Sequence, residues 1–203
     1  RLQGGRFTAS VAQGDLLSDI VYSTYVDREG NLWIGTWGAG LKRLKHGKIS
    51  FLTTKDGLSS DMVIALTEGR EGNLWIGTAG GGLNRLKDGK LTTYGTKEGL
   101  SHDLVMSVYQ DRKGNLWVGT EGGGLNLLQD GEIRPFSAGS ALSDAMVRCI
   151  YEDSSGSLWI GSATQGLVQL AGGKLKAYRT REGLSHDVVL SLYEDRRGTL
   201  WIG

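Results

Sequence analysis

The sequence predicts an all-β fold, a β-propeller of five blades with four antiparallel strands each. The first observation behind this prediction is a repeated phrase, Asn-Leu-Trp-Val-Gly-Thr in the third copy, whose tryptophan returns every 42 residues. Each repeat also contains four short apolar or alternating segments bounded by turn residues, and helical periodicity is absent. A repeat of about 40–45 residues that holds four strands is typical of a propeller blade. The repeated tryptophans are Trp33, Trp75, Trp117, Trp159 and Trp201.

The chain divides into five units that align without gaps. No linker or change of composition separates them, so residues 1–203 are expected to form a single domain. The last four units have 42 residues each, and the first is seven residues shorter. Thirty-three glycines against one proline indicate many tight turns rather than a disordered linker. The units are 1–35, 36–77, 78–119, 120–161 and 162–203.

The first strand of each unit is apolar on both faces, as in residues 104–109 of the third unit. A strand of this kind is buried on both sides, so we place it next to the central axis. One position of this strand carries a small side chain in every unit, which predicts close packing where the strands crowd together. That position is occupied by Ser23, Ala65, Ser107, Cys149 and Ser191.

The other strands follow in order. Asp111 and Gly114 bound a turn with a type I signature, which leads to the strand that holds the tryptophan; the second unit has Gly69 in place of the aspartate. The five repeated tryptophans are predicted to fill the core between blades, because large rings recur there within apolar strands. The third strand has the pattern Gly-Leu-x-x-Leu. The fourth, such as residues 90–94, alternates and is polar on one side, as an outer strand should be.

The two ends of the chain predict how the ring closes. The C-terminus stops after a second strand, whereas Arg1 and Leu2 align with Arg43 and Leu44 in a third strand. We therefore expect a closing blade that takes its inner two strands from the C-terminus and its outer two from the N-terminus. Such a seam would remove the open sheet edges. Because the segment equivalent to residues 36–42 is missing, this blade is expected to be the weakest of the ring.

Composition argues against several classes of function. The formal net charge is only +1 and the basic residues are spread over all units, so no nucleic-acid partner is expected. No apolar run approaches the roughly 20 residues of a membrane helix, so no membrane contact is expected, and no signal peptide is found. Cys149 is the only cysteine, which rules out an intramolecular disulfide. No metal or other cofactor is expected, because His102 and His186 lie on separate units and zinc needs about three converging ligands.

The segment from Asp111 to Leu125 resembles the two-component regulator propeller repeat. That repeat reads Asp-x-x-Gly-Asn-Leu-Trp-Ile-Gly-Thr-x-Gly-Gly-Gly-Leu, and here only Val118 departs from it. The resemblance covers essentially the whole chain. It implies a periplasmic or extracellular sensor propeller of hybrid two-component systems, often one that responds to glycans, although the family usually builds rings of seven blades. The closely similar units and the mid-blade ends also fit a fragment or an engineered version of such a propeller.

The loop before each first strand and the turn after each second strand should open on the same face of the propeller. This face includes one variable position, which holds Trp37, Ala79, Glu121 and Ala163 in successive units. Residues that recur in every unit are expected to hold their own loops, since serine and aspartate bond nearby backbone amides in turns. Residues that break the repeat are better candidates for a ligand contact. The candidate ligand-binding residues on this face are Trp37, Glu121, His102, Asp103, Asp144, His186 and Asp187.

Three functions are compatible with these features, and the sequence favours the first. It is a non-catalytic binding or sensor module for a polar ligand such as a glycan. The second is a ligand-free repeat scaffold that stays monomeric or self-assembles through its open closing blade. The third is a lyase-like propeller enzyme, which would need acid–base residues such as His102 and His186 across the axis. No Gly-x-Ser-x-Gly, His-Glu-x-x-His or Cys-x-x-Cys pattern is present to support nucleophilic or thiol catalysis.

Overall fold

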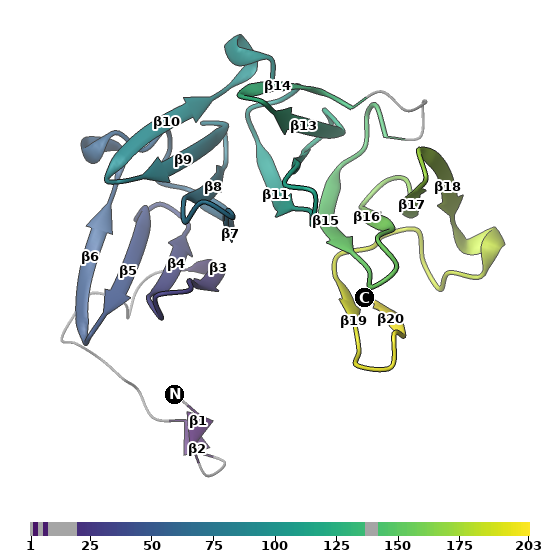
Figure 1. Ribbon diagram of the computed structural model, residues 1–203, viewed down its shortest axis with the longest axis horizontal. Helices are drawn as coiled ribbons and strands as arrows, with labels where there is room; N and C mark the ends of the chain where they lie inside the picture. Colours follow the sequence, from purple (N-terminus) through teal and green to yellow (C-terminus); the bar gives the residue numbers. More distant parts are fainter. Residues whose placement is uncertain (1, 4–5, 8–19, 137–141) are drawn as a thin grey trace.

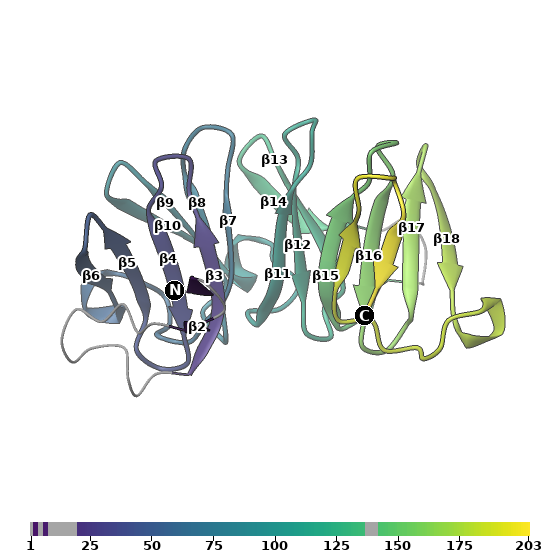
Figure 2. The same cartoon turned by 90° about the horizontal axis from the view of Figure 1, so that it is seen from below.

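The computed structural model describes residues 2–3, 6–7, 20–136 and 142–203. Four antiparallel sheets of four strands stand side by side along an arc, and a two-stranded sheet follows at the C-terminal end (Figure 1). Figure 2 shows the sheets from the side, with their strands running between two rims. The chain is therefore an all-β propeller of five blades, the last represented by its inner two strands. No helix among these residues is long and apolar enough to cross a membrane.

Within each complete blade the strands follow the sequence from the inner to the outer edge. One-turn 3-10 helices, which the sequence did not predict, lie in three of the loops that enter the next blade. They are η1 (Thr54–Asp56), η2 (Thr96–Glu98) and η3 (Thr180–Glu182). The strands are β3 (Val21–Val26), β4 (Leu32–Thr36), β5 (Leu41–Lys45) and β6 (Lys48–Leu52) in blade 1; β7 (Val63–Glu68), β8 (Leu74–Thr78), β9 (Leu83–Lys87) and β10 (Lys90–Tyr94) in blade 2; β11 (Val105–Gln110), β12 (Leu116–Thr120), β13 (Leu125–Gln129) and β14 (Glu132–Pro135) in blade 3; β15 (Val147–Glu152), β16 (Leu158–Ser162), β17 (Leu167–Ala171) and β18 (Lys174–Tyr178) in blade 4; and β19 (Leu192–Glu194) and β20 (Leu200–Ile202) in the half-blade.

The turn between the first two strands is fastened to the core tryptophan. In blade 3 the carboxylate of Asp111 accepts hydrogen bonds from the backbone N–H of Asn115 at 2.9 Å and from Nε1 of Trp117 at 2.9 Å. Gly114 closes the turn with φ of 91°, a conformation that a side chain would strain. The same aspartate-to-indole bond is present in blades 1 and 4 and in the half-blade. The predicted turn is confirmed, and its aspartate also orients the tryptophan.

The small residue of the first strand is needed for close packing between blades, as predicted. Ser107 lies directly beside Gly119 of the neighbouring strand. A Cβ added to Gly119 would collide with Ser107 and would lie 2.5 Å from Cγ1 of Val147, which belongs to the next blade. Because real Cβ atoms do not approach so closely, the glycine lets the inner strands of adjacent blades nest together.

The tryptophan prediction holds for four of the five positions. Trp33, Trp75 and Trp117 are buried in clusters that join one blade to the next. Trp159 is half-buried and its ring lies against Tyr178 of the same blade, with centroids 5.7 Å apart. Trp201 is the exception, because it is 60% exposed. The expectation that it is core was wrong for a simple reason: among the described residues no further blade packs on the half-blade, so its ring has nothing to cover it.

The predicted closing blade is not formed between the described residues of the two ends. β19 pairs with β20, and β1 (Leu2–Gln3) pairs with β2 (Arg6–Phe7), but the two hairpins are separate sheets. Figure 1 shows them apart, with β1 and β2 below the first blade and the C-terminus beside blade 4. β1 is only two residues long, so it offers few hydrogen bonds with which to hold a closing blade together.

Candidate functional site

The predicted site face is present as one rim of the propeller, here called the loop rim. It consists of the glycine turns 37–40, 79–82, 121–124 and 163–166 and the loops that enter each blade. In each complete blade the first residue of the turn donates its N–H to the residue just before the inner strand, as Glu121 does to the carbonyl of Leu104 at 3.0 Å. The turn also bonds the loop that enters the next blade, as Gly124 does to the carbonyl of Ala145 at 3.1 Å. The variable position is therefore held in the same place in every blade.

Blade 1 presents an exposed aromatic pair on this rim. Trp37 is 46% exposed and stacks on Tyr22 of β3 with ring centroids 5.0 Å apart and planes inclined by 26°. Within the described residues the Trp37 indole has no aspartate partner, unlike four of the five repeated tryptophans. Its backbone pairs with Ile20 and Met62. The two rings together form an exposed aromatic surface, and aromatic rings of this kind can stack on the apolar face of a ring-shaped ligand.

Blade 3 places three of the predicted residues around one glycine turn. Glu121 is half-buried, and its carboxylate has no hydrogen bond or ion pair within the described part of the chain. His102 adjoins the turn, because a Cβ added to Gly123 would lie 2.9 Å from His102 Cβ. On the other side the turn bonds Ala145, which follows the exposed Asp144. The turn that carries Glu121 thus adjoins both the loop of His102 and the loop of Asp144.

The repeated aspartates hold their own loops. Asp103 accepts from the backbone N–H of Thr96 at 2.7 Å, and Asp187 accepts from that of Thr180 at 2.7 Å. Asp61 makes the same bond to Thr54. Each bond fastens the 3-10 helix to the end of the loop, which is the role expected of an aspartate that recurs in almost every unit.

Each of the two histidines uses one of its ring nitrogens for a hydrogen bond within its own loop. Nδ1 of His102 accepts from the backbone N–H of Leu104 at 3.0 Å, and Nδ1 of His186 accepts from that of Val188 at 3.0 Å. An accepting Nδ1 leaves Nε2 as the donor in the neutral ring. Both rings are exposed, so this donor points to a solvent-accessible environment. No group of three histidine, cysteine or carboxylate residues that could hold a metal occurs in residues 2–3, 6–7, 20–136 and 142–203.

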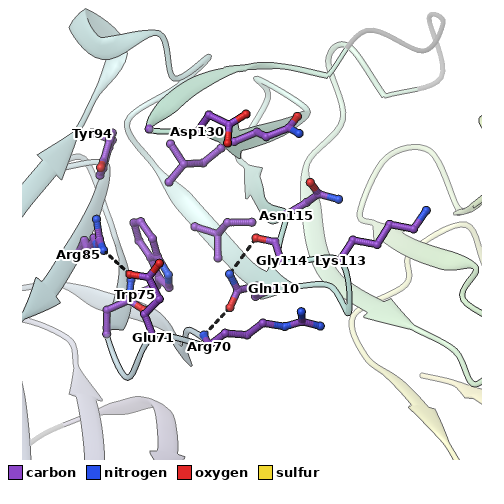
Figure 3. A pocket seen from close by; sticks show the side chains of 15 residues that line it. Arg70, Glu71, Trp75, Arg85, Tyr94, Gln110, Lys113, Gly114, Asn115 and Asp130 are labelled. Carbon is purple, nitrogen blue, oxygen red and sulfur yellow. Dashed lines mark hydrogen bonds and ion pairs between the residues drawn. The ribbon is translucent and has the colours of Figure 1, made fainter.

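The opposite rim, here called the hairpin rim, carries grooves that the sequence interpretation missed. The larger one, of about 490 Å³, lies between blades 2 and 3 (Figure 3). On its blade 2 wall Arg85 stands over the Trp75 ring at 5.6 Å and pairs with Glu71 at 3.2 Å. A hydrogen bond from Lys87 lowers the pKa of Glu71 below its usual value.

A similar groove of about 320 Å³ separates blades 1 and 2, with Arg43 over Trp33. The tryptophans of these grooves are buried, so neither offers an open ring face to a ligand. The signal for the grooves is present in the sequence, because the arginine of units one and two becomes Leu127 and Gln169 in the later units. Since a groove recurs where blades diverge, we attribute its shape to blade geometry.

A family comparison identifies the repeat. The model of the two-component regulator propeller matches five segments that together make up more than half of the chain. The chain belongs to the two-component regulator propeller family. Every candidate residue named above lies inside a matched segment. The segments are residues 15–38, 57–80, 99–122, 141–164 and 183–203.

Solved structures share the fold of this family member. The extracellular domain of a putative hybrid two-component system from B. thetaiotaomicron is 25% identical, with a TM-score of 0.80; the alignment covers 91% of this chain and 26% of that one. The extracellular domain of a second such system from the same organism is 21% identical, with a TM-score of 0.74, over 91% of this chain and 28% of that one. The chain thus spans about a quarter of the length of these domains.

Enzymes with the same fold are more distant from this propeller. Virginiamycin B lyase from Staphylococcus aureus is 17% identical, with a TM-score of 0.71, over 90% of this chain and 62% of that one. At this identity the likeness shows the fold alone. A comparison with curated proteins gives no match.

Proposed function

We propose that this propeller is a non-catalytic, ligand-binding part of a sensor that lies outside the cytoplasmic membrane, in the periplasm or beyond. Support comes from the family and from the similar structures, whose titles describe extracellular domains of hybrid two-component systems. A sensor of this kind needs a rigid frame that presents a few side chains, and the repeated blades supply that frame.

The proposed ligand is polar and ring-shaped, such as a glycan, and it binds on the loop rim. Trp37 carries the argument, because it is the one tryptophan outside the repeated column and stacks in the open on Tyr22. An aromatic plate suits the apolar face of a sugar ring, while carboxylates accept from its hydroxyl groups. Glu121 and Asp144 supply such acceptors, and Nε2 of His102 supplies a donor. We also propose ligand contacts for three residues that bond their own loops: Asp103, His186 and Asp187.

The site is tested by thermal-shift and calorimetric titration of the chain with oligosaccharides, including uronic-acid glycans. A ligand at about 100 times its Kd should stabilise the fold by about 2.7 kcal/mol, which is several degrees for a domain of this size. Trp37→Ala and Glu121→Ala should each weaken binding at least tenfold. Ala163→Ser, at the variable position of blade 4, is the matched control and should bind like the parent chain.

Two results would count against this function. If no glycan shifts the unfolding temperature, the proposed ligand class is wrong. If a ligand binds equally well to both alanine variants, the loop-rim site is wrong even though binding is real. We propose a non-catalytic role because His102 and His186 stand two units apart and each uses one ring nitrogen in its own loop. Turnover that His186→Ala abolishes would overturn that part.

A further inference from the structure

The two grooves of the hairpin rim share their shape but not their charge. Nearly every residue that lines the smaller groove, between blades 1 and 2, has its equivalent 42 positions later in the lining of the larger groove, between blades 2 and 3. Arg43 and Asp88 recur in this way as Arg85 and Asp130. Both grooves lie between complete four-stranded blades, so a difference between them is a property of the described residues themselves.

The first difference is an aspartate that is lost from the wall of the larger groove. In blade 1 the carboxylate of Asp27 accepts from Trp33 Nε1 at 2.7 Å and lines the smaller groove. Gly69 stands at the equivalent position of blade 2. The neutral amide of Asn73 occupies the space, because a Cβ added to Gly69 would collide with Asn73 Oδ1. Blade 2 thus lacks a stabilising aspartate that the four other units keep, which is a departure expected where a site has a function.

The second difference lies in the row of hydrogen bonds that joins the first turn of each blade to the next blade. At three junctions the acceptor is a glutamate, with Arg28 bonded to Glu68 at 3.0 Å, Arg112 to Glu152 at 2.7 Å and Ser154 to Glu194 at 2.8 Å. Between blades 2 and 3 the backbone N–H of Arg70 donates instead to Oε1 of Gln110 at 2.7 Å. Nε of Arg28 also lies 3.8 Å from its glutamate. Among the described residues Arg70 has no such carboxylate, and its guanidinium donates to the backbone carbonyl of Arg112.

The third difference replaces an ion pair by a single cation. On blade 2 the carboxylate of Glu71 pairs with Lys87 at 2.6 Å. The equivalent residues of blade 3 are Lys113 and Gln129, and both line the larger groove. Lys113 is exposed, and its one hydrogen bond within the described part of the chain runs from its backbone N–H to Asp111. Its ammonium group therefore has no carboxylate partner there.

All three differences make the larger groove more positive. Its lining has three cations and two carboxylates among the described residues, whereas the lining of the smaller groove has one cation and four carboxylates. Its volume of about 490 Å³ is in the range of small-molecule sites. Blade geometry accounts for the shape of both grooves and for none of these three differences. The charged residues are Arg70, Arg85, Lys113, Glu71 and Asp130 in the larger groove, and Arg43, Asp27, Glu29, Glu68 and Asp88 in the smaller.

The cations come from both sides of the larger groove. Figure 3 shows Arg85 with Glu71 on the blade 2 side and Lys113 on the blade 3 side. Glu71 accepts from Lys87 at 2.6 Å and from Arg85 at 3.2 Å, so one carboxylate serves two cations. Lys113 extends outward in this view. Its flexible four-carbon stem allows the ammonium group to turn toward a bound anion.

From these differences we propose that the groove between blades 2 and 3 binds a small organic anion through a carboxylate or sulfate group. Arg70 and Lys113 supply positive charge that no carboxylate in the described part of the chain neutralises, and Arg85 stands on the opposite wall. Guanidinium and ammonium groups bind oxyanions through charge-assisted hydrogen bonds. The groove lies on the rim opposite the loop rim, so this site is additional to the proposed glycan site and does not depend on it.

The test is calorimetric titration of the chain with sodium citrate and, separately, with sodium sulfate, at an ionic strength held constant with chloride. The two arms distinguish a carboxylate from a sulfate ligand, and at least one of them should bind saturably at one site per chain. Gln110→Glu and Lys113→Glu restore the residue types of the smaller groove and should each weaken binding at least tenfold. Both positions accept glutamate, because Glu68 and Glu71 are their equivalents.

Two further variants separate the site from general effects. Lys174→Glu makes the same charge reversal on an exposed residue at the start of β18 in blade 4, and it should bind like the parent chain. Gly69→Asp should weaken binding at least tenfold while it raises the unfolding temperature, so its loss of binding cannot come from unfolding.

Three results would overturn the proposal. The first is an absence of saturable binding of either anion to the parent chain. The second is an equal loss of binding in Lys174→Glu and Lys113→Glu, which would mean a general attraction of anions to a cationic surface. The third is a loss of anion binding in Trp37→Ala, which would place the anion on the loop rim. If Trp37→Ala loses only glycan binding, the two sites are separate, and either can fail without the other.

Discussion

The aspartate of the first turn offers a sharp test of how the blades are stabilised. Asp111 is buried, and its carboxylate accepts four hydrogen bonds, from the backbone of Lys113 at 3.0 Å, the backbone of Asn115 at 2.9 Å, Asn115 Nδ2 at 2.8 Å and Trp117 Nε1 at 2.9 Å. In Asp111→Ala the two backbone donors can turn to water. The indole N–H of the buried Trp117 cannot, so it loses its partner inside the core.

The magnitude follows from these contacts. A hydrogen bond to a charged group contributes about 1.5–3 kcal/mol, and a buried donor left without a partner costs about 1–3 kcal/mol. Asp111→Ala should therefore lower the free energy of unfolding by about 2–4 kcal/mol. For a domain of this size that corresponds to roughly 5–15 °C in Tm. Asp111→Asn keeps an acceptor oxygen for the indole and should lose about half as much.

Blade 2 allows the reverse experiment, because Gly69 stands where the other blades have aspartate. Asn73 there accepts from Trp75 Nε1 at 3.3 Å in the amide orientation that satisfies both partners. A side chain added at Gly69 would displace the Asn73 amide, which must turn as Asn115 has done. Gly69→Asp should then raise stability by about 1–2 kcal/mol, partly through lower entropy of the unfolded chain.

Calorimetry and tryptophan fluorescence during heating measure both changes. The reasoning is refuted if Asp111→Ala lowers Tm by less than about 2 °C, or if Gly69→Asp is destabilising.

Three further predictions test other parts of the structure. Burial raises the pKa of Asp153, but hydrogen bonds, including that from Trp159, outweigh it and lower the pKa below 3.8; its stabilisation is present above that value and should fade in urea titrations as pH drops below about 4. Gly119→Ala should lower the free energy of unfolding by more than about 3 kcal/mol, because the added Cβ would collide with Val147. Gly122 has φ of 81° and open space around it, so Gly122→Ala should lower the free energy of unfolding by only about 1 kcal/mol. Equal losses of the two variants in chemical denaturation would contradict the packing argument. Burial raises the pKa of the half-buried Cys149 thiol to about 12, so a disulfide reagent at pH 8 should label it far more slowly in the native chain than in the unfolded chain, and equal labelling rates would refute this argument.

The blade could be predicted from the sequence because the same local signals return in every unit. The Asp111–Gly114 turn, the inner strand with Ser107 and the outer strand Lys90–Tyr94 are all where the sequence placed them, within one residue. The 3-10 helices escaped prediction because three residues are too few to show a helical period. The burial of Trp201 was predicted wrongly because a ring at this position is covered by the next blade. The repeated sequence of its own unit does not tell whether a next blade packs on it.

The site was predicted only in outline. The rim and the variable position follow from topology, and the repeat correctly indicated that the aspartates Asp103 and Asp187 bond their own loops. The stacking of Trp37 on Tyr22 could not be predicted, because the two residues are 15 positions apart and their contact depends on how the turn folds over β3. The charges of the hairpin-rim grooves are visible in the sequence only after the blades are placed side by side.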